Sequence, residues 1–181
     1  AMGGSTDDLE QGLTAFGAKV LQWAGTNGMV IDCAHMNRKT FTEAVDILER
    51  LALPVLVSHG NAAALCPDER NFTDAQLAQI GASHGVIGVF FSGEYVAKDP
   101  AKNTIDMVVA HIQHIATQIG VEHVAIGSDF GGITKGVPRG LESFSQLDVL
   151  FEKLSQAGFS PDEVEAIAHK NAARVLRAYL Q

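Results

Sequence analysis

The feature that most constrains the fold is a set of four short apolar runs that alternate with helical patterns. The runs are rich in β-branched residues and are Met29–Ala34, Pro54–Ser58, Gly85–Phe91 and His123–Ser128. Nearly continuous apolar runs of this length are typical of strands that are buried on both faces of a parallel sheet. Each gap between successive runs is long enough for one crossover helix, so the runs predict parallel strands with right-handed connections.

Helix start and stop signals lie between these runs. The expected helices begin at Thr14, Thr40, Thr73, Asn103, Ser143 and Ser160. Three of these starts, at Thr40, Thr73 and Ser160, have the capping-box pattern in which a Glu or Gln follows three residues later. Gly28, Gly120 and Gly158 mark helix ends, and the last helical stretch is expected to run to about Leu180.

The resulting order is one helix followed by four βα units. Two α/β architectures fit this order: half of a parallel-stranded (β/α)8 TIM-like barrel, or an open doubly wound sheet. The length of 181 residues suits one domain or a piece of a larger one. We expect residues 11–181 to form that domain and residues 1–10 to be a flexible start, in which Ala1–Ser5 looks like a cloning remnant.

Composition excludes several classes of function. Lys and Arg number 13 against 21 Asp and Glu, which gives a net charge of −8 and argues against a nucleic-acid partner. No apolar run is long enough for a spanning helix, so direct membrane insertion is not expected. Cys33 and Cys66 form neither a disulfide framework nor a CxxC pair, and the cellular compartment therefore stays open.

Chemically active side chains follow the predicted strands. His35 and His59 come at the ends of the first two strands, Tyr95 follows the third, and Asp129 ends the fourth. In both architectures ligands bind at the carboxyl ends of the strands, so these residues are expected on one rim. Imidazole and carboxylate are the ligands that zinc prefers. A histidine at a strand end is more often a hydrogen-bonded core residue, and position alone leaves both interpretations open.

The remaining histidines are expected to be structural. His111 and His114 are spaced by one helical turn and share a helix face, but no zinc-protease signature accompanies them. His84 lies near a helix end, His123 begins a strand and His169 lies on the last helix.

Six segments together resemble a known family. They are Gly12–Gly17, Gly28–His35, Pro54–His59, Arg70–Asp74, Gly127–Gly132 and Asn171–Leu176. Their order and spacing are similar to those of the membrane (renal) dipeptidase family, peptidase family M19, from about residue 11 to the end of the chain. The resemblance implies the C-terminal half of a zinc-dependent βα-barrel of the amidohydrolase superfamily, which hydrolyses dipeptides.

The resemblance also implies roles for single residues. His35 and His59 match the two histidine ligands of one zinc in the family's two-zinc centre. Arg70 matches the arginine that holds the substrate carboxylate, and Tyr95 matches a tyrosine of the substrate pocket. Asp129 matches the aspartate that transfers protons between the attacking water and the leaving amine.

Two departures from the family pattern lower the zinc affinity and the activity that we expect of this chain. Gly131 stands where the family usually has a second aspartate, and no His-x-Asp metal pair occurs anywhere in the chain. The family's first four strands and their ligands are not in this sequence. We therefore expect at most one weak zinc site and no useful turnover by the chain alone. As a partner we expect a second copy of the chain or the missing N-terminal half.

Two other functional classes remain open. One is a non-catalytic half-barrel domain that keeps the fold without a complete site. The other is a small doubly wound protein that binds an unrelated ligand at the same rim.

Overall fold

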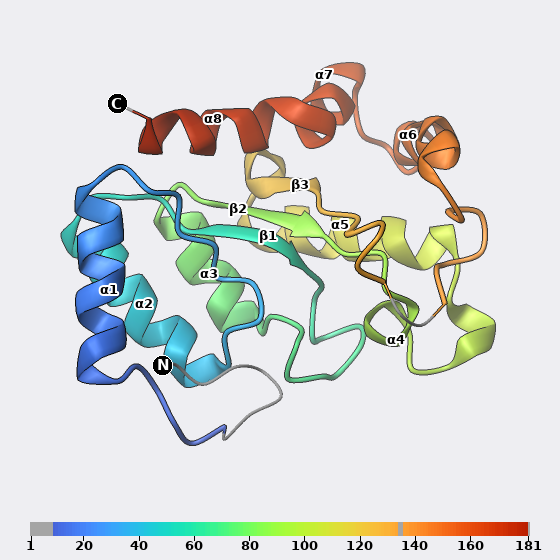
Figure 1. The fold of residues 1–181 in the computed structure, drawn as a ribbon. Coiled ribbons are helices and arrows are strands. Elements are labelled where there is room, and N and C mark those ends of the chain that lie inside the picture. Colours follow the sequence, from blue (N-terminus) through green and yellow to red (C-terminus); the bar gives the residue numbers. More distant parts are fainter. Residues whose placement is uncertain (1–8, 134–135, 181) are drawn as a thin grey trace.

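The centre of the protein is a three-stranded parallel sheet (Figure 1). The structure, a computed structural model, describes residues 9–133 and 136–180. The strands lie in the order β1 (Leu56–Gly60), β2 (Val86–Val89) and β3 (Val124–Ile126), and both neighbouring pairs are parallel. The expected cloning remnant at the N-terminus lies outside the described residues.

The first predicted strand is reduced to a single bridge. Asp32 pairs in parallel with Leu56, and the Cys33 amide donates to the Leu56 carbonyl at 2.8 Å. Met29 and Val30, at the start of this run, are 51% and 41% exposed. The prediction of four regular strands is therefore wrong for residues 29–34. The physical reason is that this run pairs on one side only, since no described residue pairs with its outer edge.

The helices follow the predicted alternation with the strands. They are α1 (Ala15–Thr26), α2 (Arg38–Arg50), α3 (Asp74–Ala82), α4 (Gly93–Val96), α5 (Ile105–Ile119), α6 (Leu147–Gln156), α7 (Pro161–Glu165) and α8 (Asn171–Tyr179). A π-helical turn, Ala166–Lys170, joins α7 to α8. Short 3₁₀ turns lie at Pro100–Lys102, Val121–His123 and Phe144–Gln146. The α/β class is thus confirmed, with α2, α3 and α5 each leading into the next strand.

Most of the expected helix caps are present. Thr14 accepts from the Gly17 amide at 3.0 Å, and complete capping boxes open α3 at Thr73 and α7 at Ser160. The capping box expected at Thr40 is wrong, because α2 begins two residues earlier and Thr40 is buried within it.

Asn37 caps α2 in place of Thr40. Its side chain accepts from the Thr40 amide at 2.8 Å and also donates to the Gln11 carbonyl at 2.8 Å. Glu43, expected to complete the Thr40 box, instead accepts from the Leu13 amide. Asn37 is as good a cap as Thr40, and it gains a tertiary contact that the sequence pattern does not reveal.

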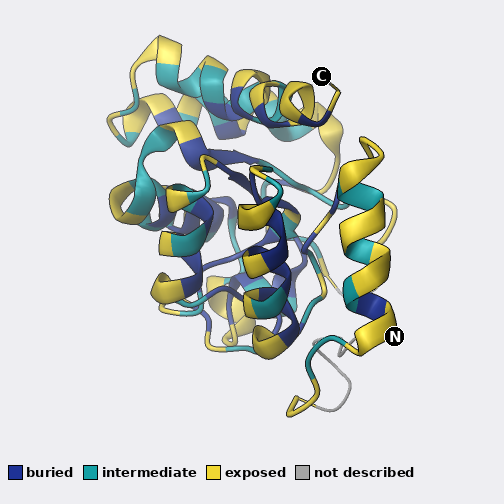
Figure 2. Ribbon diagram, turned by 90° about the vertical axis from the view of Figure 1, so that its left-hand side faces the viewer, coloured by how far each residue is buried: buried dark blue, intermediate teal, exposed yellow. Residues whose placement is uncertain are grey.

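Helices cover both faces of the sheet. On one face Val57 and Ile87 pack into the main core with residues of α2, α3 and α5. On the other face, α8 places Val175 and Tyr179 against Leu56, Val86 and Ala125 (Figure 1). Figure 2 shows the buried residues gathered on the sheet and on the helix surfaces turned towards it, whereas α1 is mostly exposed.

The α8 segment also closes the amino ends of the strands. The Tyr179 hydroxyl donates to the Pro54 carbonyl at 2.6 Å, just before β1. The Arg174 guanidinium donates to the carbonyls of His84, Gly85 and Glu122, which precede β2 and β3. The carboxyl ends of the strands stay clear of α8, and this is where the sequence predicts the site.

An apolar stripe on α1 has no cover within the described residues. Phe16, Val20 and Trp23 lie one and two turns apart on one helix face, and Phe16 and Trp23 are 71% and 59% exposed. No helix among the described residues is long and apolar enough to cross a membrane.

Candidate functional site

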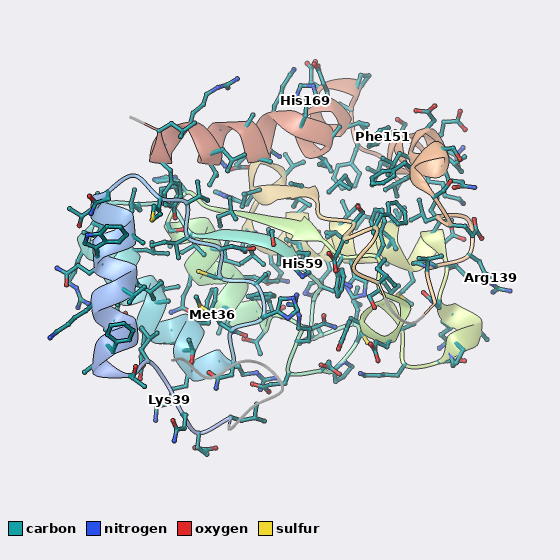
Figure 3. All side chains as sticks on the ribbon, in the orientation of Figure 1. Met36, Lys39, His59, Arg139, Phe151 and His169 are labelled. Carbon is teal, nitrogen blue, oxygen red and sulfur yellow. The ribbon has the colours of Figure 1, made fainter. Side chains whose placement is uncertain are left out.

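Four predicted site residues come from segments that end at the same side of the sheet. His59 is the fourth residue of β1, and Figure 3 shows it where that strand ends. His35 follows the bridge residue Asp32, Tyr95 lies on α4 directly after β2, and Asp129 follows β3. Because the strands are parallel, their carboxyl ends form one rim.

The two histidines face each other through their Nε2 atoms. The Nε2 of His35 lies 3.0 Å from the Nε2 of His59, and the rings meet edge to face with centroids 4.9 Å apart. Burial lowers the pKa of both imidazoles, and the positive charge of Arg70 lowers them further. Both effects favour neutral imidazole, the form that binds metals.

A hydroxyl and a carboxylate lie in succession on the Nδ1 side of His59. The Ser58 hydroxyl donates to Asp32 Oδ2 at 2.5 Å, and Ser58 Oγ lies 2.7 Å from His59 Nδ1. The other oxygen of Asp32, Oδ1, accepts from the amides of Ser58 and Ala34 at 2.9 and 3.0 Å. Asp32 and Ser58 lie in the strand-end motifs, but the sequence pattern predicts no role for either residue.

Arg70 lies buried beside this pair. It is 5% exposed, its Nη2 donates to the His59 carbonyl at 3.3 Å, and its guanidinium carbon lies 5.4 Å from the centre of the Phe90 ring. Among the described residues it forms no ion pair with a carboxylate. Burial lowers the pKa of Arg70, but arginine keeps its charge. An anionic ligand suits such a guanidinium.

Asp68 and Lys98 hold the loop that carries Arg70. Asp68 accepts from the Arg70 amide at 2.9 Å and from Lys98 Nζ at 2.5 Å. The Lys98 ammonium also lies 5.9 Å from the centre of the Tyr95 ring. These contacts join the loop after β1 to the segment after α4, so Arg70 and Tyr95 are held by one cluster.

Phe90 forms an aromatic wall that the sequence pattern does not indicate. Its ring stacks on Tyr95, with centroids 5.6 Å apart and an interplanar angle of 18°, and it meets the His59 ring at 4.9 Å. Tyr95 is thus linked to the histidine pair through Phe90. The available signal was that the third apolar run continues past the strand to Phe91.

Asn61 is a second residue of the site for which the sequence pattern predicts no role. Its side-chain NH₂ group donates to the carbonyls of Phe90 and Tyr95, each at 3.1 Å, and its oxygen accepts from the Phe90 amide at 3.1 Å. Asn61 is fully buried. It therefore ties the end of β1 to the end of β2 and fixes the backbone from which Phe90 and Tyr95 project.

Asp129 lies in a tight turn after β3. Its φ is 55°, and its carbonyl accepts from the Gly132 amide at 3.0 Å. A β-carbon on Gly132 would approach the Asp129 carboxylate to 2.6 Å, so glycine leaves the space that this side chain occupies. The negative charge of Asp129 acts on the pKa of His35 and His59 in the direction opposite to burial and Arg70.

The helix histidines are held by other contacts, as the structural interpretation predicts. His111 is fully buried, accepts from the Ala62 amide at 3.1 Å and donates through Nε2 to the Val96 carbonyl at 2.9 Å. Burial lowers the pKa of His111 to about 4. His114 contacts Asp74 at 2.8 Å instead of joining His111.

The histidine pair fits part of a metal site. Two nitrogen ligands at zinc–nitrogen distances of about 2.0–2.1 Å and tetrahedral angles lie about 3.3 Å apart. The separation of 3.0 Å between the two Nε2 atoms is close to this value. Within residues 9–133 and 136–180, no group of three His, Cys, Asp or Glu side chains is arranged to hold a metal ion. The spacing of the two Nε2 atoms is thus compatible with two nitrogen ligands of one metal ion.

Comparison with known proteins gives consistent matches. The family model for membrane dipeptidase, peptidase family M19, matches residues 2–181. Dipeptidase tcpJ of Claviceps purpurea is 36% identical over 169 residues, which are 93% of this chain and 39% of that protein. Dipeptidase ataJ of Aspergillus terreus is 36% identical over 166 residues, which are 91% of this chain and 40% of that protein.

A solved structure matches the fold. A metallo peptidase from Rhodobacter sphaeroides, crystallised with a phosphinate mimic of the dipeptide L-Ala-D-Ala, has a TM-score of 0.85 and 28% identity, covering 93% of this chain and 47% of that one. The chain thus spans less than half the length of these relatives. The resemblance predicted from the six motifs is confirmed, and this chain belongs to the membrane dipeptidase family, peptidase family M19.

Proposed function

We propose that this chain supplies the C-terminal half of a metal-dependent dipeptidase site. One observation carries the proposal: two Nε2 atoms 3.0 Å apart lie beside a buried guanidinium that makes no ion pair with the described residues. A metal ion and a substrate carboxylate are the two ligands that such a pair of groups suits. Membership of a dipeptidase family supports dipeptides as the substrate class.

The proposal includes the architecture. Residues 11–181 would form four βα units of a (β/α)8 barrel if the run Met29–Ala34, which here makes a single bridge, gained a partner on its outer edge from the other half-barrel. The parallel sheet and the single bridge at Asp32 support this arrangement. The likeness to a metallo peptidase of about twice the length also supports it.

His35 and His59 would hold one zinc ion. Zinc in this position would act as a Lewis acid towards the peptide carbonyl and would acidify water. The lowered pKa of both histidines keeps them neutral and available as ligands. Two nitrogens are fewer than the three protein ligands of a catalytic zinc, so this chain alone would bind a single ion weakly.

Arg70 and Tyr95 would bind the substrate. The planar guanidinium of Arg70 suits the C-terminal carboxylate of a dipeptide, and burial strengthens the interaction because water competes less. The Tyr95 and Phe90 rings would form the wall of the pocket along the substrate side chain. Binding at Arg70 would place the peptide bond towards the histidine pair.

Asp129 would transfer protons. Its carboxylate would take a proton from the attacking water and deliver it to the leaving amine, so that the peptide C–N bond breaks with a neutral amine as the leaving group. The turn at Gly132 leaves room for the carboxylate at this place. The rest of the site would come from an N-terminal half-barrel or from another copy of the chain.

A non-catalytic half-barrel is the second candidate. One observation favours it: no three-residue metal-binding group occurs among the described residues. Under this interpretation the rim is a remnant that binds neither zinc nor dipeptide at useful concentrations.

Dipeptide hydrolysis separates the two candidates. We would assay L-Ala-D-Ala and Gly-containing dipeptides with the chain alone and with the chain fused behind the first half of the Rhodobacter sphaeroides metallo peptidase. The dipeptidase proposal predicts turnover by the fusion only, and loss of that turnover on Asp129→Asn. A fusion that binds two zinc ions but hydrolyses no dipeptide would overturn the dipeptidase proposal. Turnover by the pure monomer would overturn the proposal that the chain carries only half of the site.

A further inference from the structure

We infer that Asp32 and Ser58 are positioning residues, which fix the proton of His59 on Nδ1 and thereby turn the Nε2 lone pair towards the metal position. The inference rests on the proposed metal site, and it assigns a role to two residues outside the predicted ligand set. Its basis is a linear chain of short contacts, from Asp32 Oδ2 to Ser58 Oγ at 2.5 Å and from Ser58 Oγ to His59 Nδ1 at 2.7 Å.

The direction of each hydrogen bond follows from counting hydrogens. An ionised carboxylate only accepts, so the hydroxyl of Ser58 donates its single hydrogen to Asp32 Oδ2. The hydroxyl oxygen then has only lone pairs to offer to His59. A contact of 2.7 Å between Ser58 Oγ and His59 Nδ1 is a hydrogen bond only if Nδ1 carries the proton.

This tautomer has a consequence at the other side of the ring. A neutral imidazole with its proton on Nδ1 has a lone pair on Nε2, and Nε2 of His59 is the atom that faces His35 at 3.0 Å. Metal-binding histidines commonly donate their other ring N–H to a carboxylate, a carbonyl or water, which fixes the tautomer. Here the donation passes through a serine to the carboxylate.

The carboxylate is itself held in place. Asp32 Oδ1 accepts from the amides of Ser58 and Ala34, which leaves Oδ2 directed at the Ser58 hydroxyl. Asp32 and Ser58 are both exposed at the rim, so this chain of contacts does not belong to the hydrophobic core. The Oδ1 contact with the Ser58 amide connects Asp32 to β1, whereas the Oδ2 contact acts on His59 through the Ser58 hydroxyl.

The substitution Asp32→Asn separates the backbone contacts of Oδ1 from the contact of Oδ2 with the Ser58 hydroxyl. In Asp32→Asn, the retained oxygen can still accept from both amides, and the new NH₂ group replaces Oδ2. That group must donate to Ser58 Oγ, so the Ser58 hydroxyl must donate to His59 Nδ1. The proton of His59 then moves to Nε2, which blocks the metal position while the segment keeps its backbone contacts.

The test combines a tautomer measurement with zinc affinity. Long-range ¹H–¹⁵N spectra of the metal-free chain at mildly alkaline pH report which nitrogen of His59 is protonated. We expect Nδ1–H in the wild type, Nε2–H in Asp32→Asn and a mixture in Ser58→Ala, with Ser58→Thr restoring Nδ1–H. Zinc affinity measured by calorimetry should fall by about 10–100-fold in Asp32→Asn and Ser58→Ala.

A matched control comes from α3. Asp74→Asn removes a carboxylate that contacts His114 at 2.8 Å and should leave the His59 signals and the zinc affinity unchanged. An Asp32→Asn protein with Nδ1–H still on His59 and normal zinc affinity would overturn the inference. If Asp32→Asn does not fold, equal spectra and affinities for Ser58→Ala and wild type would overturn it.

Failure of the proposed metal site would look different. The wild-type chain would then bind no zinc in the calorimeter. If that chain bound no zinc while the His59 proton still moved to Nε2 in Asp32→Asn, the hydrogen-bond chain would be supported and only the metal proposal would be overturned.

Discussion

Two non-glycine residues at the rim, His35 and Asp129, have left-handed backbone conformations, with φ of 66° and 55°. Such a conformation costs about 1–3 kcal/mol in a non-glycine residue and persists only where the surrounding structure enforces it. Both residues follow strand segments, where a sharp turn directs the side chain to the rim. The proposed ligand His35 and the proposed proton carrier Asp129 are therefore placed by strained turns that the rest of the fold stabilises.

The sequence pattern predicts the residues at the rim, but it does not predict the residues that hold them in place. His35, His59 and Asp129 stand out because parallel strands must bring their carboxyl ends together. Phe90 and Asn61 were missed because their roles depend on where α4 folds back over the end of β1. Whether the residues proposed for metal, substrate and proton transfer act in those roles stays a prediction.

A first prediction concerns Gly131, where the family usually has an aspartate. Its φ is 99°, and a β-carbon would have open space around it. Gly131→Ala should therefore lower the free energy of unfolding by about 1 kcal/mol through backbone strain alone. Gly131→Asn should cost less, since asparagine tolerates left-handed conformations better. Urea unfolding would rank the three proteins, and equal stability of the glycine and alanine forms would contradict the prediction.

A second prediction concerns Arg70. In the complete enzyme, Arg70→Lys should lower kcat/KM for dipeptides by about 10-fold or more, since a point charge replaces a planar fork and such contacts contribute about 1.5–3 kcal/mol. Steady-state kinetics on Gly-containing dipeptides would measure it. Arg139→Lys is the matched control, because Arg139 is exposed and, among the described residues, its guanidinium donates only to the Ala101 carbonyl. An unchanged kcat/KM in Arg70→Lys would remove Arg70 from the substrate site.

A third prediction concerns Asp129. In the complete enzyme, Asp129→Asn should abolish most turnover and leave the metal content unchanged, because it removes proton transfer rather than a ligand. Elemental analysis and dipeptide kinetics would be measured on the same samples, with the exposed Asp148→Asn as control. Loss of metal in proportion to activity would show that Asp129 is a ligand instead.

At the scale of elements, the alternation of strands and helices was predictable because each element carries its own signal. The caps at Thr14, Thr73 and Ser160 are local and were confirmed. The cap at Thr40 and the strand over residues 29–34 were wrong because tertiary contacts decide them. Asn37 caps the helix by accepting from the Thr40 amide while it donates to the Gln11 carbonyl, and within the described part of the chain the 29–34 run pairs only through Asp32.

A fourth prediction concerns how α5 is joined to the loops of the rim. His111 on α5 bonds the backbone of Ala62 and Val96, and burial lowers its pKa from 6.5 to about 4. The unfolded chain therefore takes up the proton first as the pH falls. Stability should be fully present above pH 6.5 and should decline between about pH 6.5 and 4, by on the order of 3 kcal/mol.

Urea unfolding at a series of pH values would test this prediction. His111→Gln should be less stable at neutral pH but should lose much of the decline between pH 6.5 and 4. His169→Gln, at an exposed histidine on the π-helical turn, should retain the full decline. A decline of the same size in His111→Gln would assign the acid sensitivity to other groups.

At the scale of the whole molecule, the chain presents surfaces that suit a second half-barrel. The run Met29–Ala34, which pairs with β1 through Asp32, has an outer edge that no described residue pairs with. The apolar stripe on the preceding helix, formed by Phe16, Val20 and Trp23, is exposed. Open sheet edges and exposed apolar stripes usually mark interfaces. The proposed half-site agrees with this, because no group of three metal-binding side chains occurs among the described residues and a complete site would take further ligands from a partner.

Zinc titration of the isolated chain tests the central claim most directly. Calorimetry and elemental analysis would be performed on the wild type, His35→Ala and His59→Ala, with the exposed His169→Ala as control. The half-site predicts at most one weakly bound zinc ion per chain, lost in both rim variants and retained in the control. Two tightly bound zinc ions per monomer, or one that survives both rim substitutions, would contradict the account.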